Sequence, residues 1–158
     1  MFKSLKVPFG VGLSIAIVAT AGLAASHTAS SSNKAVAARH AQMQMIGYNT
    51  GLLGAMAKGE VDFSAEMANS AAINLNMLAK MDTSTLWTEG TEQGAADGSR
   101  AKAEIWSDAA GFADKFADLE KASAAMIGAA DVDAVKAGMG AIGGACKACH
   151  ESYRGPKN

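Results

Sequence analysis

The feature that most constrains the fold lies near the end of the chain, where residues 146–150 read Cys-Lys-Ala-Cys-His. A C-x-x-C-H motif is the attachment signature of a c-type haem. At about 100° per residue on an α-helix, Cys146, Cys149 and His150 fall within an arc of roughly 100°. One flat macrocycle can therefore lie against that face, bonded to both cysteines and coordinated through its iron by the histidine.

Three other interpretations of the two cysteines compete with haem attachment. A thioredoxin-like C-x-x-C stands at a helix N-terminus after a strand, where the helix dipole lowers the thiol pKa, whereas this motif ends a helical pattern. A structural zinc site needs four protein ligands, and the other two histidines are distant in sequence. A simple disulfide is the third alternative. We predict one covalently attached haem c as the cofactor.

The first 25 residues have the pattern of a secretory signal peptide. Lys3 and Lys6 form a basic segment, an apolar run follows over residues 7–25, and its small-residue end offers a cleavage site. The run is close to the length that spans a bilayer, so an uncleaved anchor is the alternative. We predict residues 1–25 as the signal peptide, residues 26–158 as one mature domain, and the periplasm as its location.

Composition limits the function of the mature chain. Cleavage removes two lysines and no acidic residue, leaving 133 residues with 12 basic and 15 acidic side chains, a formal net charge of −3. This mild acidity argues against nucleic-acid binding, which calls for a basic patch. Aromatic residues make up only 6% of the chain, so a large apolar cofactor would complete a core built mainly from alanine and methionine.

Hydrophobic periodicity predicts four helices and no strand. The first helix covers about residues 34–58 and ends at Gly59, a residue type that favours a left-handed helix cap. The second begins after Asp62 or Ser64, both good N-caps, and continues to about residue 81. Its predicted inner face consists of Phe63, Met67, Ala71, Asn74, Leu78 and Met81.

An irregular stretch over residues 82–99 separates the second helix from the third, and loops of this length are usually functional or disordered. The predicted third helix carries one continuous stripe of inner residues, Ile105, Ala109, Phe112, Phe116, Leu119, Ser123 and Met126. The fourth begins at Asp131 or Asp133 and carries both cysteines in its apolar seam. These patterns predict an all-α, antiparallel up-down-up-down four-helix bundle with covalently bound haem.

A C-terminal C-x-x-C-H on the last helix of such a bundle resembles the class II c-type cytochromes, of which the cytochrome c′ family is the best known. The resemblance covers essentially the whole mature chain. It includes Arg39 and Met43, residues 54–59, residues 90–92, residues 104–108, and residues 146–150 followed by Tyr153 and Arg154.

The resemblance implies roles for residues of the last helix. Cys146 and Cys149 would hold the haem, and His150 would be the proximal ligand of the iron. Arg154 lies four residues after His150, on the same helix face, and would stand beside the proximal imidazole. The alternative for Arg154 is a cation that interacts with the helix C-terminus.

The resemblance also implies contacts to the haem edge from Arg39, His40, Thr91 and Glu92. A guanidinium suits the anionic haem propionates because it binds carboxylates through two hydrogen bonds. Arg39 at a solvated helix start and His40 as a second iron ligand are the alternatives for these two residues. In the loop, residues 88–89 could take the place of Thr91 and Glu92.

Met43 occupies the distal position in this resemblance, and its role separates two functions. If its sulfur binds the iron, the haem is six-coordinate and low-spin, Met/His ligation raises the potential, and the protein is an electron carrier. If Met43 only packs over the iron, the haem is five-coordinate and high-spin and can bind NO or CO. Thioethers in apolar pockets more often pack than coordinate, so we predict the five-coordinate form.

An NO-scavenging or peroxidase-like enzyme is a third hypothesis. Peroxide cleavage needs a distal base and a charged stabiliser, and an apolar Met43 pocket supplies neither, so we predict no catalysis. The expected partners are periplasmic redox proteins, the gases NO and CO, and a second copy of the chain. Dimers of the family often form through the first two helices, where Met45, Gly51 and Met56 are expected to be exposed.

Overall fold

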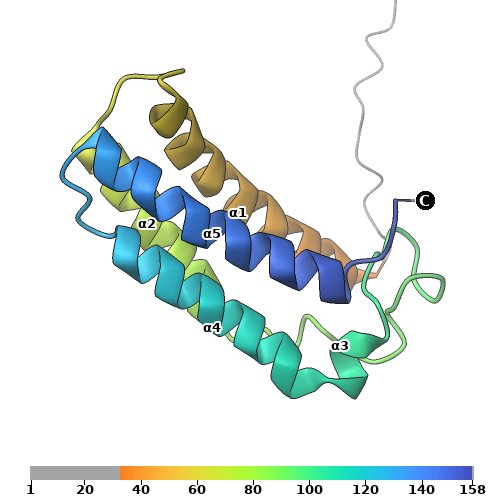
Figure 1. Cartoon of the computed structure of the whole chain (residues 1–158). Coiled ribbons are helices and arrows are strands. Elements are labelled where there is room, and N and C mark those ends of the chain that lie inside the picture. The colour runs from red at the N-terminus through yellow and green to blue at the C-terminus, as the bar shows by residue number, and fades with distance from the viewer. Residues whose placement is uncertain (1–32, 158) are drawn as a thin grey trace, which may run out of the picture.

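The structure is a computed structural model that describes residues 33–157, and within this range it is all-helical (Figure 1). The elements are α1 (Lys34–Lys58), α2 (Ala65–Lys80), α3 (Glu104–Ser107), α4 (Ala109–Met126) and α5 (Val132–Tyr153). The four long helices alternate in direction, which confirms the predicted four-helix bundle. The predicted signal peptide lies outside the described residues. Among residues 33–157, none of the helices has the length and apolar character that crossing a bilayer requires.

Helix ends follow the cap residues of the sequence. Gly59 ends α1 in a left-handed conformation with φ 74°, as predicted. Ser64, and not Asp62, caps α2 by accepting a hydrogen bond from a backbone N–H three residues on at 3.2 Å. Asp131, and not Asp133, caps α5 in the same way at 2.8 Å. Each cap satisfies an N–H group that the first helical turn leaves unpaired.

The core is rich in alanine, and this changes which face of α2 is buried. The core side chains are Ile46, Leu53, Met56, Ala68, Ala71, Ala72, Leu75, Ala79, Leu119, Ala122, Met126, Val135, Ile142 and Ala145. The predicted inner face of α2 is wrong at Met67 and Met81, which are 42% and 41% exposed, and at Asn74, which is also exposed. It is confirmed at Ala71, which is buried, and at Phe63 and Leu78, which pack against the core. The expected exposure of Met56 is also wrong, because its side chain is fully buried. Small alanine side chains let helix backbones approach closely, and the longer methionines of α2 point outward.

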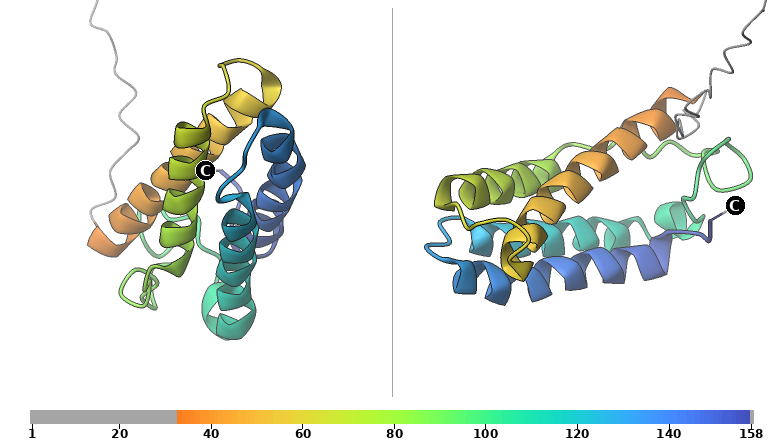
Figure 2. Two further views of the ribbon diagram at one scale, coloured as in Figure 1. Left: turned by 90° about the vertical axis from the view of Figure 1, so that its left-hand side faces the viewer. Right: turned by 90° about the horizontal axis from the view of Figure 1, so that it is seen from above.

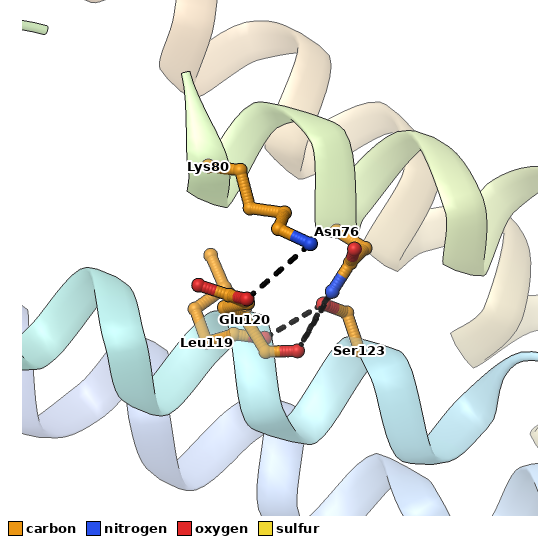
Figure 3. Close-up of polar contacts among 5 residues, drawn as sticks. All are labelled: Asn76, Lys80, Leu119, Glu120 and Ser123. Carbon is orange, nitrogen blue, oxygen red and sulfur yellow. Dashed lines mark hydrogen bonds and ion pairs between the residues drawn. The ribbon is translucent and has the colours of Figure 1, made fainter. Parts of the chain in front are cut away.

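A polar contact joins α2 to α4 inside this close packing (Figure 3). Asn76 Nδ2 donates a hydrogen bond to the Glu120 carbonyl at 2.9 Å and to Ser123 Oγ at 3.4 Å. Lys80 Nζ lies 3.4 Å from Glu120 Oε1 at the surface. Because Ser123 is completely buried, these contacts specify how α2 is registered against α4.

The predicted third helix is interrupted at Asp108, which divides it into α3 and α4. Asp108 has a non-helical backbone (φ −129°, ψ 56°), and its side chain caps α4 by accepting from the Gly111 N–H at 3.1 Å. Its other carboxylate oxygen accepts a hydrogen bond of 2.6 Å from the Tyr153 hydroxyl of α5. The predicted stripe is broken at the same point: Ala109 is exposed, whereas Phe112 is buried. The cap of α4 and the hydrogen bond to α5 together stabilise the structure more than an unbroken helix through Asp108 would.

The Asp108–Tyr153 hydrogen bond fastens the start of α4 to the last turn of α5, three residues beyond His150. The donated hydrogen bond stabilises the ionised carboxylate and lowers the pKa of Asp108. The same bond, together with burial and the nearby negative charge, raises the pKa of Tyr153 to about 12. The stability of the contact between α4 and the end of α5 therefore depends on the protonation states of Asp108 and Tyr153.

Tyr153→Phe should lower the free energy of unfolding at neutral pH. The difference from the unsubstituted protein should shrink as pH rises from 10 to about 12, because the folded tyrosine keeps a proton that the unfolded one has lost. It should also shrink in acid, as pH falls from 3.8 through the lowered pKa of Asp108. Denaturant unfolding across this pH range measures both. Tyr48→Phe, at a tyrosine 64% exposed, is the control, and a pH-independent difference for Tyr153→Phe would contradict the coupling.

Candidate haem site

A cavity of about 690 Å³ lies between α1, α4, α5 and the long loop, residues 81–103. Its volume is in the range of cofactor sites. Both views of Figure 2 show α1 and α5 close together near the end of α1 and separated toward its start. The lining residues are Arg39, His40, Met43, Ile46, Gly47, Thr50, Gly51, Gly54 and Lys58 of α1, Trp87, Ser99, Arg100 and Ala101 of the loop, Phe112, Lys115, Phe116 and Leu119 of α4, and Met139, Ala145, Cys146, Cys149, His150, Tyr153 and Arg154 of α5 or just after it.

The α5 wall brings together the three residues of the C-x-x-C-H motif. Cys146 and Cys149 are free, half-buried thiols, and burial raises the pKa of both, to about 11 for Cys149. Partial burial lowers the pKa of His150, and the positive charges of Arg154 and Arg100 lower it further. At neutral pH the imidazole is therefore neutral, which leaves one ring nitrogen with a lone pair for a metal ion.

The α1 side of the cavity holds a buried cation. Arg39 is only 3% exposed. Its Nη1 donates to Thr91 Oγ1 at 2.9 Å, and its Nη2 donates to the Thr91 carbonyl at 3.0 Å and to Ser99 Oγ at 3.3 Å. No carboxylate of residues 33–157 forms an ion pair with it, and burial lowers the pKa of its guanidinium. A buried charge without a counter-charge is costly, so an anionic group in the cavity would stabilise this arrangement.

Trp87 supplies an unpaired hydrogen-bond donor beside this cation. The Arg39 guanidinium carbon lies 4.8 Å from the centre of the Trp87 ring, a cation–π distance. The indole nitrogen of Trp87 is buried with no hydrogen-bond acceptor among the described residues. The sequence pattern did not identify Trp87 as a site residue. The available signal was a large apolar pair, Leu86 and Trp87, in the long loop, which indicates that this segment packs against another part of the molecule.

The structure separates the other predicted site residues into two groups. His40, Met43 and Arg154 line the cavity. Thr91 and Glu92 do not line it: Thr91 is buried and supports Arg39, and Glu92 is half-buried. The alternative pair, residues 88–89, is exposed. Only Thr91 of the four loop residues is therefore joined to the site, and it acts through Arg39.

Three basic residues that were not predicted as site residues also border the cavity. Lys58 comes from α1, Lys115 comes from α4, and Arg100 comes from the long loop. Arg100 Nη2 donates to the Gly155 carbonyl at 2.6 Å, which holds the loop against the segment after α5. With Arg154, these residues give the cavity a cationic border without a matching group of acids in its lining.

These residues fit a c-type haem. Two thiols one helical turn apart and an adjacent neutral imidazole stand on one wall, which suits two thioether bonds and one axial ligand. Aliphatic and aromatic side chains from α1 and α4 form much of the lining. The buried Arg39 and the unpaired Trp87 N–H suit an anionic acceptor. A haem matches these three features of the cavity, since it can bond to the α5 wall, its flat ring is largely apolar, and it carries two anionic propionates.

Comparison with known proteins gives the same assignment. The family model described as cytochrome C′ matches residues 34–154. Cytochrome c-554 of Cereibacter sphaeroides is 40% identical over 73% of this chain and 89% of its own length. Cytochrome c′ of the same species is 38% identical over 85% of this chain and 91% of its own length. A solved cytochrome c′ from Rhodobacter sphaeroides superposes with a TM-score of 0.74, at 38% identity, over 78% of this chain and 96% of that structure.

Proteins of this family carry a covalently attached c-type haem, and they generally serve as electron carriers or gas binders and not as enzymes in the usual sense. Some are dimers, and the homologues are periplasmic. The matched region includes all five helices and both sides of the cavity. The chain therefore belongs to the cytochrome c′ family of electron-transfer haem proteins.

Proposed function

We propose that Cys146 and Cys149 form the thioether bonds to the haem and that His150 is the proximal ligand of its iron. The observation that carries this proposal is that α5 presents both thiols and the imidazole to one largely apolar cavity. The lowered pKa of His150 supports it, since coordination needs the neutral imidazole. Arg39 supports it from the other side of the cavity as a buried partner for a propionate, held in place by Thr91.

We propose that the haem is five-coordinate and high-spin and that it binds NO or CO on the side of Met43. When bound, the haem supplies an iron that can gain or lose one electron and bind a small gas. Along α1 the lining residues that follow Met43 are Ile46, Gly47, Thr50, Gly51 and Gly54, none of which carries a charge, and the one charged lining residue beyond them is Lys58, the last residue of α1. Such a wall favours small neutral ligands over anions.

A low-spin electron carrier is the second candidate, in which Met43 is the sixth iron ligand. The observation in its favour is that Met43 itself lines the cavity, one helical turn after Arg39. Both candidates use the same residues on α5, and they differ only in whether the thioether coordinates or packs. In both, we propose no catalytic residue, export through residues 1–25 to the periplasm, and exchange of electrons with periplasmic redox proteins.

The outer face of α1 and α2 supports a homodimer. Large side chains are exposed there, with Met45 at 49%, Tyr48 at 64%, Ile73 at 37%, Met77 at 66% and Met81 at 41%. Met45, Met77 and Met81 also line one surface pocket. An exposed apolar group of this kind is typical of an interaction surface, and we propose that a second copy of the chain covers it.

The optical spectrum distinguishes the two iron states. We expect a high-spin spectrum that changes when CO is added to the reduced protein. Met43→Ala should then speed CO binding several-fold, because it uncrowds the distal side. A low-spin spectrum indifferent to CO, converted to high-spin by Met43→Ala, would instead establish Met43 as a ligand. Met67→Ala, at an exposed methionine of α2, is the matched control.

Haem attachment itself is tested by changing both cysteines. Cys146→Ser combined with Cys149→Ser should remove all haem that stays with the polypeptide after denaturation and acid–acetone extraction. The physical reason is that only thioether bonds resist this treatment. Retention of haem by the double variant, or absence of haem from the unsubstituted protein expressed in a host that attaches haem c, would contradict the proposal.

The dimer is tested by adding a charge to its interface. Met77→Lys should convert the dimer to a monomer in analytical ultracentrifugation, because burying an unpaired ammonium group is costly. Ile127→Lys changes an exposed apolar side chain of 42% exposure outside this face and should leave the dimer intact. A monomeric unsubstituted protein at all concentrations would refute the proposal.

A further inference from the structure

We propose that Trp87 donates a hydrogen bond from its indole N–H to a haem propionate, beside Arg39, so that the two side chains form one carboxylate-binding site. This inference rests on the proposed haem attachment and extends it to a residue of the long loop. The ligand class is a carboxylate, and the propionates are the carboxylates that a haem would bring into the cavity.

The first argument is the unpaired donor. Trp87 lines the cavity, and its indole nitrogen is buried without an acceptor. An indole N–H can only donate, and buried donors without a partner are uncommon in folded proteins. Trp106 offers a direct comparison, because its indole nitrogen donates to the Trp87 carbonyl at 2.9 Å. The indole N–H of Trp106 is thus satisfied by the protein, whereas the buried indole N–H of Trp87, a residue that lines the cavity, has no acceptor among the described residues.

The second argument is charge. The three hydrogen bonds that the Arg39 side chain donates to Thr91 and Ser99 all end on neutral oxygens. The guanidinium carbon lies 4.8 Å from the centre of the Trp87 ring, so an anion bound at Arg39 would lie close to the indole. Hydrogen bonds to an ionised acceptor are stronger than those between neutral groups. A carboxylate would therefore compensate the buried cation and accept from the indole N–H together.

The third argument is rigidity. The Trp87 ring packs edge-on against Phe112 of α4 with ring centres 4.8 Å apart, and its carbonyl is held by Trp106. Arg39 is held by Thr91 and Ser99 from the same loop. Both donors are therefore positioned before the ligand arrives, which reduces the conformational entropy that binding costs.

The direct test is a crystal structure of the haem-loaded protein. We expect Trp87 Nε1 within about 3 Å of a propionate oxygen, with Arg39 bound to the same carboxylate. An indole nitrogen that faces the porphyrin ring, or that donates to a protein carbonyl, would overturn the inference. This measurement needs no variant, so it remains valid if substitution at Trp87 impairs folding.

The second test is the reduction potential of Trp87→Phe. The substitution keeps an aromatic ring beside Arg39 and removes the N–H group. We expect a lower potential, because a propionate that has lost a donor presents more negative charge to the iron and favours its oxidised form. Tyr48→Phe is the control, since it removes a polar hydrogen from an aromatic side chain that is exposed and does not line the cavity, and its potential should be unchanged.

The outcomes separate the two proposals. Equal potentials for Trp87→Phe and the unsubstituted protein, both with a full content of attached haem, would overturn the role of Trp87 and leave the proposed function intact. A protein without attached haem would overturn the proposed function, and this inference with it. Haem content is measured from the absorbance of the pyridine complex after alkaline denaturation.

Discussion

The architecture depends on one packing constraint: two thiols and an imidazole on the last turns of α5 face a space that the side chains of the bundle leave open. Elsewhere the helices pack closely, because α2 presents Ala68, Ala71 and Ala72 to its neighbours. At the cavity, α1 diverges from α5 instead (Figure 2). A chain with few aromatic residues is thus well packed at one end and completed by its cofactor at the other.

A single buried guanidinium organises the long loop on the α1 side of the cavity. Arg39 bonds to Thr91 and Ser99 and lies over Trp87, so three residues from different parts of the loop are held at one point. This explains how a segment without regular secondary structure can form a defined wall. The desolvation of the guanidinium is unfavourable by itself, and in our proposal a haem propionate supplies the compensating charge.

The opposite wall is fastened by polar contacts around the end of α5. Asp108 interrupts the third predicted helix, caps α4 and accepts from Tyr153. Beyond Tyr153 the chain pairs with the loop, where the Gly155 N–H donates to the Arg100 carbonyl at 2.7 Å. Backbone pairing thereby brings Arg100 and Arg154 together at the cavity border despite their like charges. Partial burial lowers the pKa of His150, and the positive charges of these two arginines lower it further.

The sequence by itself determined the number of long helices, the cap at Gly59 and the helix face that carries the haem-binding motif, because these depend on local spacing and capping chemistry. It narrowed two further caps to pairs of candidates, from which the structure selected Ser64 and Asp131. Only the tertiary structure decided the buried face of α2, since alanine gives a weak hydrophobic signal and the larger methionines mislead the pattern. It also decided the interruption at Asp108 and the positions of Arg39 and Trp87. These depend on hydrogen bonds and ring contacts between segments distant in sequence, about which local periodicity carries no information.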